Sequence, residues 1–269
     1  MDAQRRQRYM QAMGIPVWKP KLAVVAAEVV PVFPEENPSP TLPLSGERAR
    51  AEVVPFSSPD NGRSGGVSSV QSGERVSDCS TLSWQDLRAT VLACTRCDIS
   101  KTRKQAVFGV GDPQARWMII GEAPGADEDR RGEPFVGKAG QLLNNMLSAI
   151  GLPRESVYIA NVLKCRPPNN RDPKPEEAAN CRAYLERQIE LVNPTLILVV
   201  GRIAAQNLLH TQAPLARLRG QEHRAPLSQT PVIVTYHPAY LLRQPADKRK
   251  AWQDLQFALE VFARHAERH

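Results

Sequence analysis

Four of the five cysteines in the chain are spaced in two pairs that could hold a metal. Two residues separate Cys94 from Cys97, and fifteen separate Cys165 from Cys181. A Cys-x-x-Cys sequence at the end of a helix can direct both thiolates at one point, and two distant cysteines complete a four-sulfur shell. Because the cysteine count is odd and the sequence shows no export signal, we expect no disulfides. The spacing leaves zinc and an iron–sulfur cluster both open. Cys79 is expected to be a thiol of the linker.

Three polar residues and one glycine follow the ends of four apolar runs. Glu122, Asn161, Gly201 and His237 each come directly after or close behind such a run. Glu122 belongs to a loop locked by glycine and proline at residues 121–125, which leaves a buried strand and leads into a helix. In open α/β sheets the loops at the carboxyl ends of parallel strands converge on one crevice. We therefore expect these side chains to gather along one edge of a sheet.

The elements that must position them can be read from the periodicity. Continuous apolar runs predict buried strands at residues 117–120, 157–160, 196–200 and 232–235. Apolar spacing and end signals predict helices at 138–150, 175–192 and 248–264. Strands alternating with helices favour the α/β class, here a three-layer α/β/α sandwich with a mostly parallel central sheet.

The chain divides into three parts. The folded domain is predicted at residues 83–269, with Ser83 as the N-cap of its first helix. Residues 21–82 are rich in Pro, Ser and Gly and cannot bury enough apolar surface to order themselves, so we expect a disordered linker. Together with residues 1–20 it forms a disordered N-terminal arm before the domain.

Residues 1–20 form a small unit of their own. Basic residues precede a short predicted helix that ends at Gly14, and Ile15, Val17 and Trp18 follow. A frayed terminus is one interpretation. The other is a docking peptide anchored by Trp18, because this pattern resembles the amino-terminal peptide of the psi subunit of the bacterial clamp loader. That resemblance implies a replication protein as partner.

The charge of the chain favours a polyanionic partner. Its formal net charge is +7 and its pI about 9.3. One basic loop surrounds Cys165 and includes Arg171, and Arg217, Arg219 and Arg224 form a second that we expect at the same sheet edge. The sequence has no apolar run long enough for a membrane helix, so we expect a cytoplasmic, nucleoid-associated monomer.

His237 opens the sequence HPAYLLR. A single histidine is often only a structural hydrogen-bonding group. The predicted position of His237 beside Glu122 favours a catalytic role. Farther along the same segment are Leu241, Leu242 and Arg243. Two leucines that can wedge between bases and an arginine that can contact phosphate suit binding in a DNA groove.

With these residues assembled, the domain resembles the family 4 uracil-DNA glycosylases, the iron–sulfur branch of that superfamily. The matching segments are GEAPGADEDRRGEPFVGKAGQLL, VYIANVLKCRPPNNR, the four paired cysteines and HPAYLLR. The resemblance implies hydrolytic release of uracil from DNA, leaving an abasic site. It also implies a structural [4Fe-4S] cluster on Cys94, Cys97, Cys165 and Cys181, with zinc as the alternative.

The same resemblance assigns roles in base recognition. A flipped uracil needs a pocket, in which Phe135 stacks on the ring and the Asn161 amide matches uracil O4 and N3–H but not cytosine. Glu128 is implied near uracil C5, where bulk excludes the methyl group of thymine. Ala123 stands where some members have glycine, which narrows the pocket.

The chemical step is assigned to two further residues. His237 stabilises charge growing on uracil O2, while the Glu122 carboxylate positions water and favours a cationic sugar. Whether Glu122 is a true general base stays open. Leu241, Leu242 and Arg243 fill or flank the gap left by the base, and Arg171 tracks phosphate.

Two other classes of function compete with this one. A non-catalytic, metal-stapled DNA-binding or replication accessory protein would also explain the basic charge, the cysteines and the arm. A nucleotide-binding enzyme could use the loop at residues 121–125, although a phosphate-binding lysine is missing from it. The joint presence of Glu122, Phe135, Asn161 and His237 favours the glycosylase.

Overall fold

A computed structural model describes residues 7, 11, 13, 14 and 79–266. Six strands form one sheet in the order β1-β3-β2-β4-β6-β5. They are β1 (Val110–Gly111), β2 (Trp117–Gly121), β3 (Tyr158–Asn161), β4 (Leu196–Val200), β5 (His223–Arg224) and β6 (Pro231–Thr235). β3, β2, β4 and β6 run parallel, and β1 and β5 pair with the outer two in the antiparallel sense. The predicted mostly parallel sheet is confirmed.

Helices alternate with these strands along the chain. The α-helices are α2 (Trp84–Leu92), α3 (Ala126–Arg131), α4 (Lys138–Ala149), α5 (Pro175–Val192), α6 (Arg202–Leu208), α7 (Leu215–Leu218), α8 (Pro238–Arg243) and α9 (Lys248–Ala266). The 3₁₀ turns are η1 (Asp98–Lys101), η2 (Arg154–Ser156), η3 (Pro168–Asn170) and η4 (Pro245–Asp247). Among the helices of the described residues, none combines the length and apolarity needed to span a membrane.

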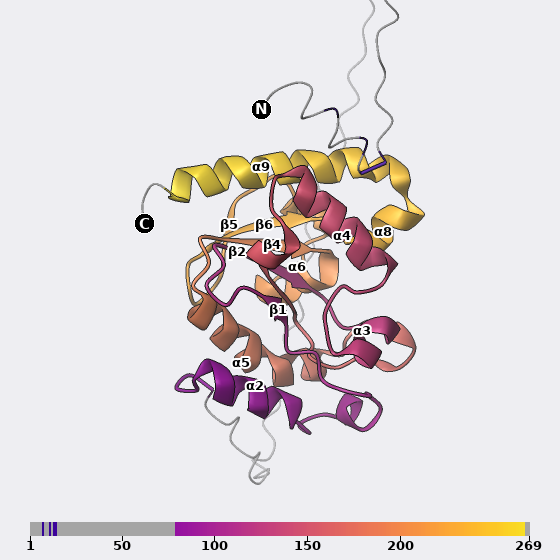
Figure 1. Cartoon of the computed structure of the whole chain (residues 1–269), viewed down its shortest axis with the longest axis vertical. Coiled ribbons are helices and arrows are strands. Elements are labelled where there is room, and N and C mark those ends of the chain that lie inside the picture. The colour runs from indigo at the N-terminus through magenta and orange to yellow at the C-terminus, as the bar shows by residue number, and fades with distance from the viewer. Residues whose placement is uncertain (1–6, 8–10, 12, 15–78, 267–269) are drawn as a thin grey trace, which may run out of the picture. The chain divides into compact units, whose positions relative to one another are not determined.

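The helices cover both faces of the sheet, as Figure 1 shows. Ile119, on β2, packs with buried residues of α4 and α9. Its neighbour Ile120 points the other way and packs with residues of α5 and α6. Because successive side chains of a strand alternate between its two faces, both faces need an apolar cover. The three-layer sandwich is confirmed.

Several local predictions can now be compared with the structure. Ser83 caps α2 by accepting a hydrogen bond from the Asp86 N–H at 3.2 Å, as predicted. The residues after His237 form the short helix α8, which Pro238 can begin because its missing N–H is not needed at the first position of a helix. Two-residue strands such as β1 and β5 are too short to leave a periodic signal.

The domain begins earlier than residue 83. Cys79 is only 3% exposed and packs in a cluster with Leu87 and Val91. Arg187 on α5 donates two hydrogen bonds to the Leu82 carbonyl, at 2.8 and 3.0 Å. The expectation that Cys79 belongs to a linker is therefore wrong, because apolar packing draws residues 79–82 into the domain. Residues 21–78 of the predicted linker lie outside the described residues.

Four described residues belong to the predicted docking peptide. Gln7 and Gln11 are helical, and Gly14 has a φ of +65°, so the predicted helix end is confirmed. Met13 is 1% exposed and belongs to the same core cluster as residues of α4 and α9. The remainder of residues 1–20, with the proposed anchor Trp18, lies outside the described residues.

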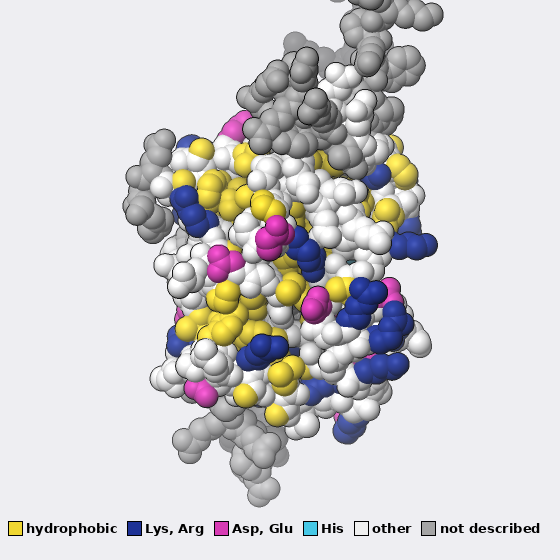
Figure 2. Space-filling view, viewed as in Figure 1, with side chains coloured by type: hydrophobic (Ala, Val, Ile, Leu, Met, Phe, Trp, Pro, Cys, Tyr) yellow, Lys and Arg dark blue, Asp and Glu magenta, His cyan; other side chains and the backbone are white. Residues whose placement is uncertain are grey.

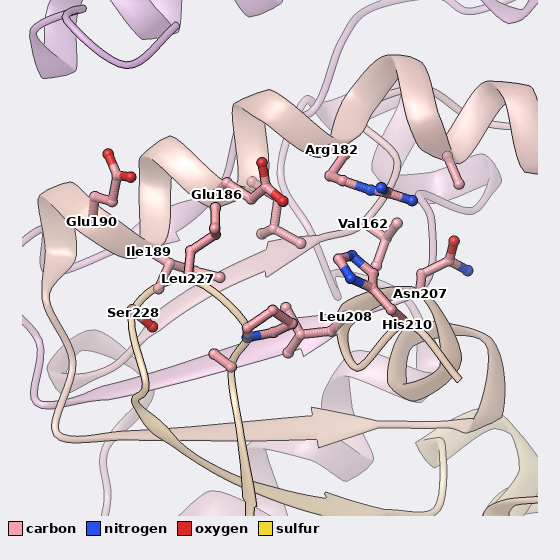
Figure 3. A pocket seen from close by; sticks show the side chains of 14 residues that line it. Val162, Arg182, Glu186, Ile189, Glu190, Asn207, Leu208, His210, Leu227 and Ser228 are labelled. Atoms are coloured by element: carbon pink, nitrogen blue, oxygen red, sulfur yellow. The ribbon is translucent and has the colours of Figure 1, made fainter. Parts of the chain in front are cut away.

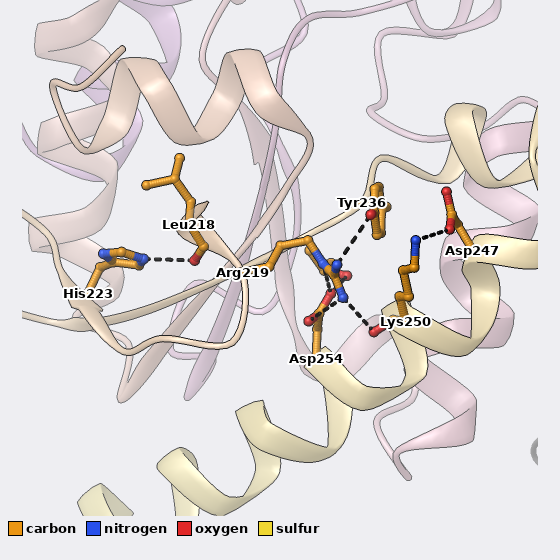
Figure 4. Close-up of polar contacts among 8 residues, drawn as sticks. Leu218, Arg219, His223, Tyr236, Asp247, Lys250 and Asp254 are labelled. Atoms are coloured by element: carbon orange, nitrogen blue, oxygen red, sulfur yellow. Dashed lines mark hydrogen bonds and ion pairs between the residues drawn. The ribbon is translucent and has the colours of Figure 1, made fainter. Parts of the chain in front are cut away.

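A largely buried ion pair joins Arg219, directly after α7, to α9 (Figure 4). The Arg219 guanidinium donates to the Asp254 carboxylate at 2.7 and 2.9 Å, and also to Tyr236 Oη and the Lys250 carbonyl. Thr235 donates its hydroxyl proton to Asp254 as well, at 2.7 Å. The predicted phosphate contact of Arg219 is therefore wrong, because its donors are used within the fold.

Arg224 also lies away from the predicted edge. It pairs with Pro231 at the amino end of β6, whereas His237 follows the carboxyl end of that strand. A short antiparallel strand returns the chain to the opposite end of the sheet, so the second basic loop does not act as one surface.

Removal of the Asp254 carboxylate tests how much the Arg219–Asp254 ion pair contributes to the free energy of unfolding. Asp254→Ala leaves the Arg219 charge buried without its partner, and we expect the free energy of unfolding to fall by about 3–5 kcal/mol. Asp98→Ala removes the exposed Lys101–Asp98 pair and should cost far less, because solvent screens both charges. Urea denaturation of both variants measures the difference. Equal losses would show that the buried pair contributes no more than a surface pair.

Candidate active site

The residues that follow β2, β3 and β6 meet in one pocket of about 420 Å³. Its walls include every side chain predicted for catalysis and base recognition: Glu122, Ala123, Glu128, Phe135, Asn161 and His237. Arg171 and Arg243 also line it. The convergence expected from the strand ends is confirmed, because parallel strands deliver their following loops to one edge of the sheet.

Asn161 and Phe135 lie at the floor of this pocket. Asn161 is 2% exposed, and among the described residues no donor reaches its Oδ1. A Cβ on Gly121, which faces Asn161 across the β2–β3 register, would lie 2.5 Å from that oxygen and 2.6 Å from the Phe135 ring. Only glycine at position 121 therefore lets the amide and the ring stand side by side.

The Phe135 backbone is held in a left-handed conformation, with a φ of +54°. Glu128 accepts hydrogen bonds from the next two amides, Val136 N–H at 2.9 Å and Gly137 N–H at 3.1 Å. Arg154 donates to the carbonyl of the preceding Pro134 at 2.6 Å. Such a conformation persists only where the surroundings determine it, so these bonds fix the ring before any ligand arrives.

Glu128 therefore has a clear structural task. Its second oxygen accepts from the Gly125 N–H at 3.1 Å, so one carboxylate joins the loop after β2 to the loop before α4. All three contacts are charge-assisted hydrogen bonds to backbone amides. The implied position beside uracil C5 stays a prediction.

His237 caps α8 and is held as one tautomer. Its Nδ1 accepts a hydrogen bond from the Ala239 N–H at 3.1 Å, so the proton of the neutral ring lies on Nε2. Burial lowers the pKa of His237 to about 4, and the nearby Arg243 charge acts in the same direction. The imidazole is therefore a neutral N–H donor near pH 7, and its ring lies 5.7 Å from the Phe135 ring, centroid to centroid.

Glu122 is the second titratable group of the pocket. Burial raises its pKa to about 7, the Asp172 carboxylate adds to the increase, and Arg202 opposes it. Asp172 and Arg202 form an ion pair at 3.2 Å. The backbone is fixed by a hydrogen bond from the Leu163 N–H to the Glu122 carbonyl, at 3.0 Å. A carboxyl with this pKa can hold or release a proton at neutral pH.

None of the four paired cysteines lines this pocket. Cys165 and Cys181 are 4% exposed. Burial raises the pKa of Cys97, Cys165 and Cys181, and nearby thiols add to the increase: Cys94 at Cys97, Cys94 and Cys97 at Cys165, and Cys97 and Cys165 at Cys181. Among the described residues, no set of three or more His, Cys, Asp or Glu is arranged to hold a metal ion. None of the four is joined in a disulfide.

Hydrogen-bond donors nevertheless face three of these sulfurs. Arg103 Nη1 donates to Cys165 Sγ at 2.8 Å. The backbone amides of Ile99 and Ser100 face Cys97, and that of Lys164 faces Cys181. Donors directed at sulfur suit thiolates that carry negative charge in a bound metal group. The donor set thus fits a four-sulfur ligand shell.

The predicted DNA contacts divide into two groups. Leu241 is 0% exposed and packs in the core, so its predicted insertion into DNA is wrong: the turn of α8 points it inward. Leu242 is 45% exposed and Arg243 is also exposed. Arg171 forms a bidentate ion pair with Glu177, which restrains the guanidinium at the pocket wall.

A further basic surface was not anticipated. Arg130 and Arg131 on α3 are exposed, and Figure 2 shows Lys and Arg side chains gathered on the side that carries α3 and α8. The sequence signal was present in the pair of arginines at 130–131, but periodicity alone does not say which way they point.

A second hollow lies between α5, α6 and the turn after β5 (Figure 3). Val162, Ile189 and Leu208 form its apolar floor, and Glu186 and Glu190 stand along its rim. Its volume is about 30 Å³, which is the room taken by one water molecule in the liquid. None of the predicted catalytic or base-binding residues lines it, so the chemistry belongs to the larger pocket.

Comparison with known proteins gives consistent matches. Residues 108–256 match the family model of the uracil DNA glycosylase superfamily. The chain is 48% identical over 169 residues to a type-4 uracil-DNA glycosylase of Archaeoglobus fulgidus, covering 61% of this chain and 85% of that protein. It is 43% identical over 159 residues to the type-4 enzyme of Thermotoga maritima, covering 59% and 82%. A type-5 uracil-DNA glycosylase of Thermus thermophilus is 36% identical over 118 residues, covering 38% and 53%.

The pKa of Glu122 can be tested by stability alone. Its folded pKa of about 7 lies above the ordinary 4.5, so the native carboxyl keeps its proton. The stability that this proton provides is complete below the unfolded pKa and is lost as the pH rises through the folded one. Glu122→Gln should therefore stabilise the protein more at about pH 8 than at about pH 5, by about 1–3 kcal/mol. Urea denaturation at both pH values gives the difference, and a pH-independent difference would contradict the raised pKa.

Proposed function

Because the chain belongs to the uracil-DNA glycosylase superfamily, and within it to the type-4 enzymes, we infer that it removes uracil from DNA. It is a DNA-repair hydrolase that cleaves the N-glycosidic bond, releasing free uracil and leaving an abasic site. The observation that carries this conclusion is the joint position of Glu122, Phe135, Asn161 and His237 in one pocket. A non-catalytic DNA-binding accessory protein would not need this set, and that alternative is set aside.

Base recognition is proposed to use the floor of the pocket. Phe135 offers an apolar ring face, and the Asn161 side chain offers one donor and one acceptor that match uracil O4 and N3–H. The unused Oδ1 of Asn161 supports this role, because a buried amide oxygen without a donor is costly until a ligand supplies one. Ala123 lines the pocket beside the base, and Glu128 holds the loop that would border uracil C5.

The chemical step is proposed to use the neutral imidazole and the carboxyl. As the bond between C1′ and N1 breaks, its electron pair moves onto uracil, and the His237 Nε2–H donates to the charge growing on O2. The Glu122 carboxylate favours the cationic sugar and orients a water molecule, whose oxygen bonds to C1′. Because its pKa is about 7, Glu122 can accept the proton that this water releases.

DNA contact is proposed for the exposed end of α8. Leu242 would occupy the space vacated by the flipped base, and Arg243 and Arg171 would bind phosphate. The exposed arginines of α3 extend the same side of the molecule (Figure 2). These side chains would bend the target strand toward the pocket without reading its sequence.

We propose a [4Fe-4S] cluster on Cys94, Cys97, Cys165 and Cys181, with zinc as the less favoured alternative. The group would supply rigidity to the loops beside the DNA rather than chemistry at the base. Support comes from the cysteine spacing, from the N–H donors directed at sulfur, and from the resemblance to the iron–sulfur branch.

For the amino-terminal segment we propose a replication protein as partner of residues 1–20. The pattern of basic residues followed by Ile15, Val17 and Trp18 supports it. We also propose that the enzyme acts as a monomer in the cytoplasm, at the nucleoid where its DNA substrate lies.

Asn161→Ala tests the base-reading role. The variant loses both hydrogen bonds to uracil, and we expect excision to fall about a hundredfold or more, while affinity for uracil-free DNA changes less than about twofold. Excision is measured by alkaline cleavage of a labelled uracil-containing oligonucleotide, and binding by fluorescence anisotropy. Asn207→Ala, on α6 and outside the pocket, is the matched control. Full activity of Asn161→Ala would remove the amide from the mechanism.

Arg103→Met tests the metal group. Loss of the N–H donor to Cys165 Sγ should make anaerobically purified protein lose its absorbance near about 400 nm faster in air, by about threefold or more. The exposed Arg182 follows Cys181 directly, and Arg182→Met should behave like the parent. Iron analysis distinguishes the metals: about four irons per chain supports the cluster, whereas about one zinc and no iron would overturn it.

A further inference from the structure

Lys164 places its side-chain amine in the interior of the domain. Its side chain is among the largest that are fully buried, at 1% exposure. Nζ donates to the Asn161 carbonyl at 2.8 Å and to Gln188 Oε1 at 2.6 Å. An amine is removed from water at a high cost unless hydrogen bonds compensate it, so these two acceptors determine where the side chain can lie.

The orientation of Gln188 is fixed by its other partners. Its Nε2 donates to the Phe108 carbonyl at 2.9 Å and to Tyr158 Oη at 3.0 Å. Since a carbonyl oxygen can only accept, the nitrogen must face Phe108 and the oxygen must face Lys164. Gln188, at 0% exposure, is thus an acceptor that cannot turn away from Nζ.

The backbone around Lys164 is equally restrained. Its carbonyl accepts from the Val107 N–H at 2.7 Å. Its side chain reaches back three residues to Asn161, which ends β3, and closes the turn that follows the strand. Val162 N–H also donates to the Gly121 carbonyl at 2.9 Å. The main chain that carries the Asn161 amide is therefore held by β2 on one side and by Lys164 on the other.

The same turn reaches the cysteines. Lys164 precedes Cys165, and its backbone N–H faces the sulfur of Cys181. Cys181 lies on α5 seven residues before Gln188, so both residues project from the same side of the helix. One residue thus contacts the base-reading segment with its side chain and the cysteine group with its backbone.

We propose that Lys164 is a positioning residue: with Gln188 it fixes the Asn161 main chain, and it joins the cysteine site mechanically to uracil recognition. The proposal rests on the proposed reading of uracil by Asn161. It gives the four cysteines a function at a distance, because a change in their ligand shell reaches the pocket through this turn and not through direct contact with the base.

Lys164→Met tests the proposal in cluster-loaded protein. Met keeps the length of the side chain and loses the donors. The inhibition constant of free uracil should rise about tenfold or more, because the amide is no longer held toward the base. Affinity for uracil-free DNA should change less than about twofold. Gln188→Met removes one acceptor of Nζ and keeps the Asn161 contact, so a smaller increase is expected.

Ile189→Ala is the matched control for stability. Ile189 is 4% exposed, lies beside Gln188 on α5 and takes no part in the polar network, so the variant should melt at a lower temperature while binding uracil like the parent. If Lys164→Met binds uracil like the parent, or loses affinity only as Ile189→Ala does, the proposal is wrong. If Lys164→Met does not fold, Gln188→Met decides: uracil affinity equal to that of the parent overturns the proposal.

A spectroscopic measurement separates this proposal from the proposed function. With asparagine labelled by ¹⁵N, the side-chain resonances of Asn161 in the parent should be sharp and should shift on addition of uracil. In Lys164→Met they should broaden before uracil is added. If the parent signals are sharp but do not shift on addition of uracil, and the variant signals broaden, Asn161 does not bind uracil but Lys164 still positions it. If the Asn161 signals of the variant stay as sharp as those of the parent, Lys164 does not position Asn161, and the proposed function is unaffected.

Discussion

The shape of the pocket depends on the absence of a Cβ at Gly121, the last residue of β2. Gly121 leaves the space in which the Asn161 amide and the Phe135 ring stand together, and a side chain there would displace both. The first turn of α4 applies the same constraint from the opposite side, since a Cβ on Gly140 would lie 1.8 Å from the Phe135 carbonyl oxygen. Phe135 is thus enclosed between two glycines in a conformation that it would not adopt freely. The recognition surface is built before the base arrives, which limits the entropy lost on binding.

Burial shifts the pKa values of two pocket residues, Glu122 and His237, in opposite directions but favours the neutral form of each. It raises the pKa of Glu122 and lowers that of His237, so each group is drawn toward its neutral form. A neutral imidazole with a fixed tautomer can donate to a developing anion without first losing a charge. A carboxyl poised near neutrality responds to its neighbours, Asp172 and Arg202, whose ion pair lies close by. Burial, rather than any single partner, is the largest cause of both pKa shifts.

Periodicity was sufficient to predict the order of the layers and the edge where the site forms. The ends of β4 and α5 were placed to the residue because continuous apolar runs and first-turn signals mark them. The inward turn of Leu241 could not be predicted, since α8 is a single short helix whose phase is set by packing. Neither could the contacts of Arg154 or Lys164, because each joins segments by a side chain whose partner depends on the tertiary fold. Sequence motifs thus located side chains that line the pocket and missed those that hold the lining in place.

The two outermost strands carry a consequence for the behaviour of the protein in solution. A long exposed edge strand, at the margin of a sheet, offers unpaired backbone amides and carbonyls to a second molecule. Such edge strands promote aggregation. In the described part of the chain the margins are β1 and β5, each two residues long and antiparallel to its neighbour. Gly111 ends the first with a φ of +116°, and Arg224 places a charge in the second. Both margins therefore discourage the addition of a strand from a second molecule to the apolar inner strands.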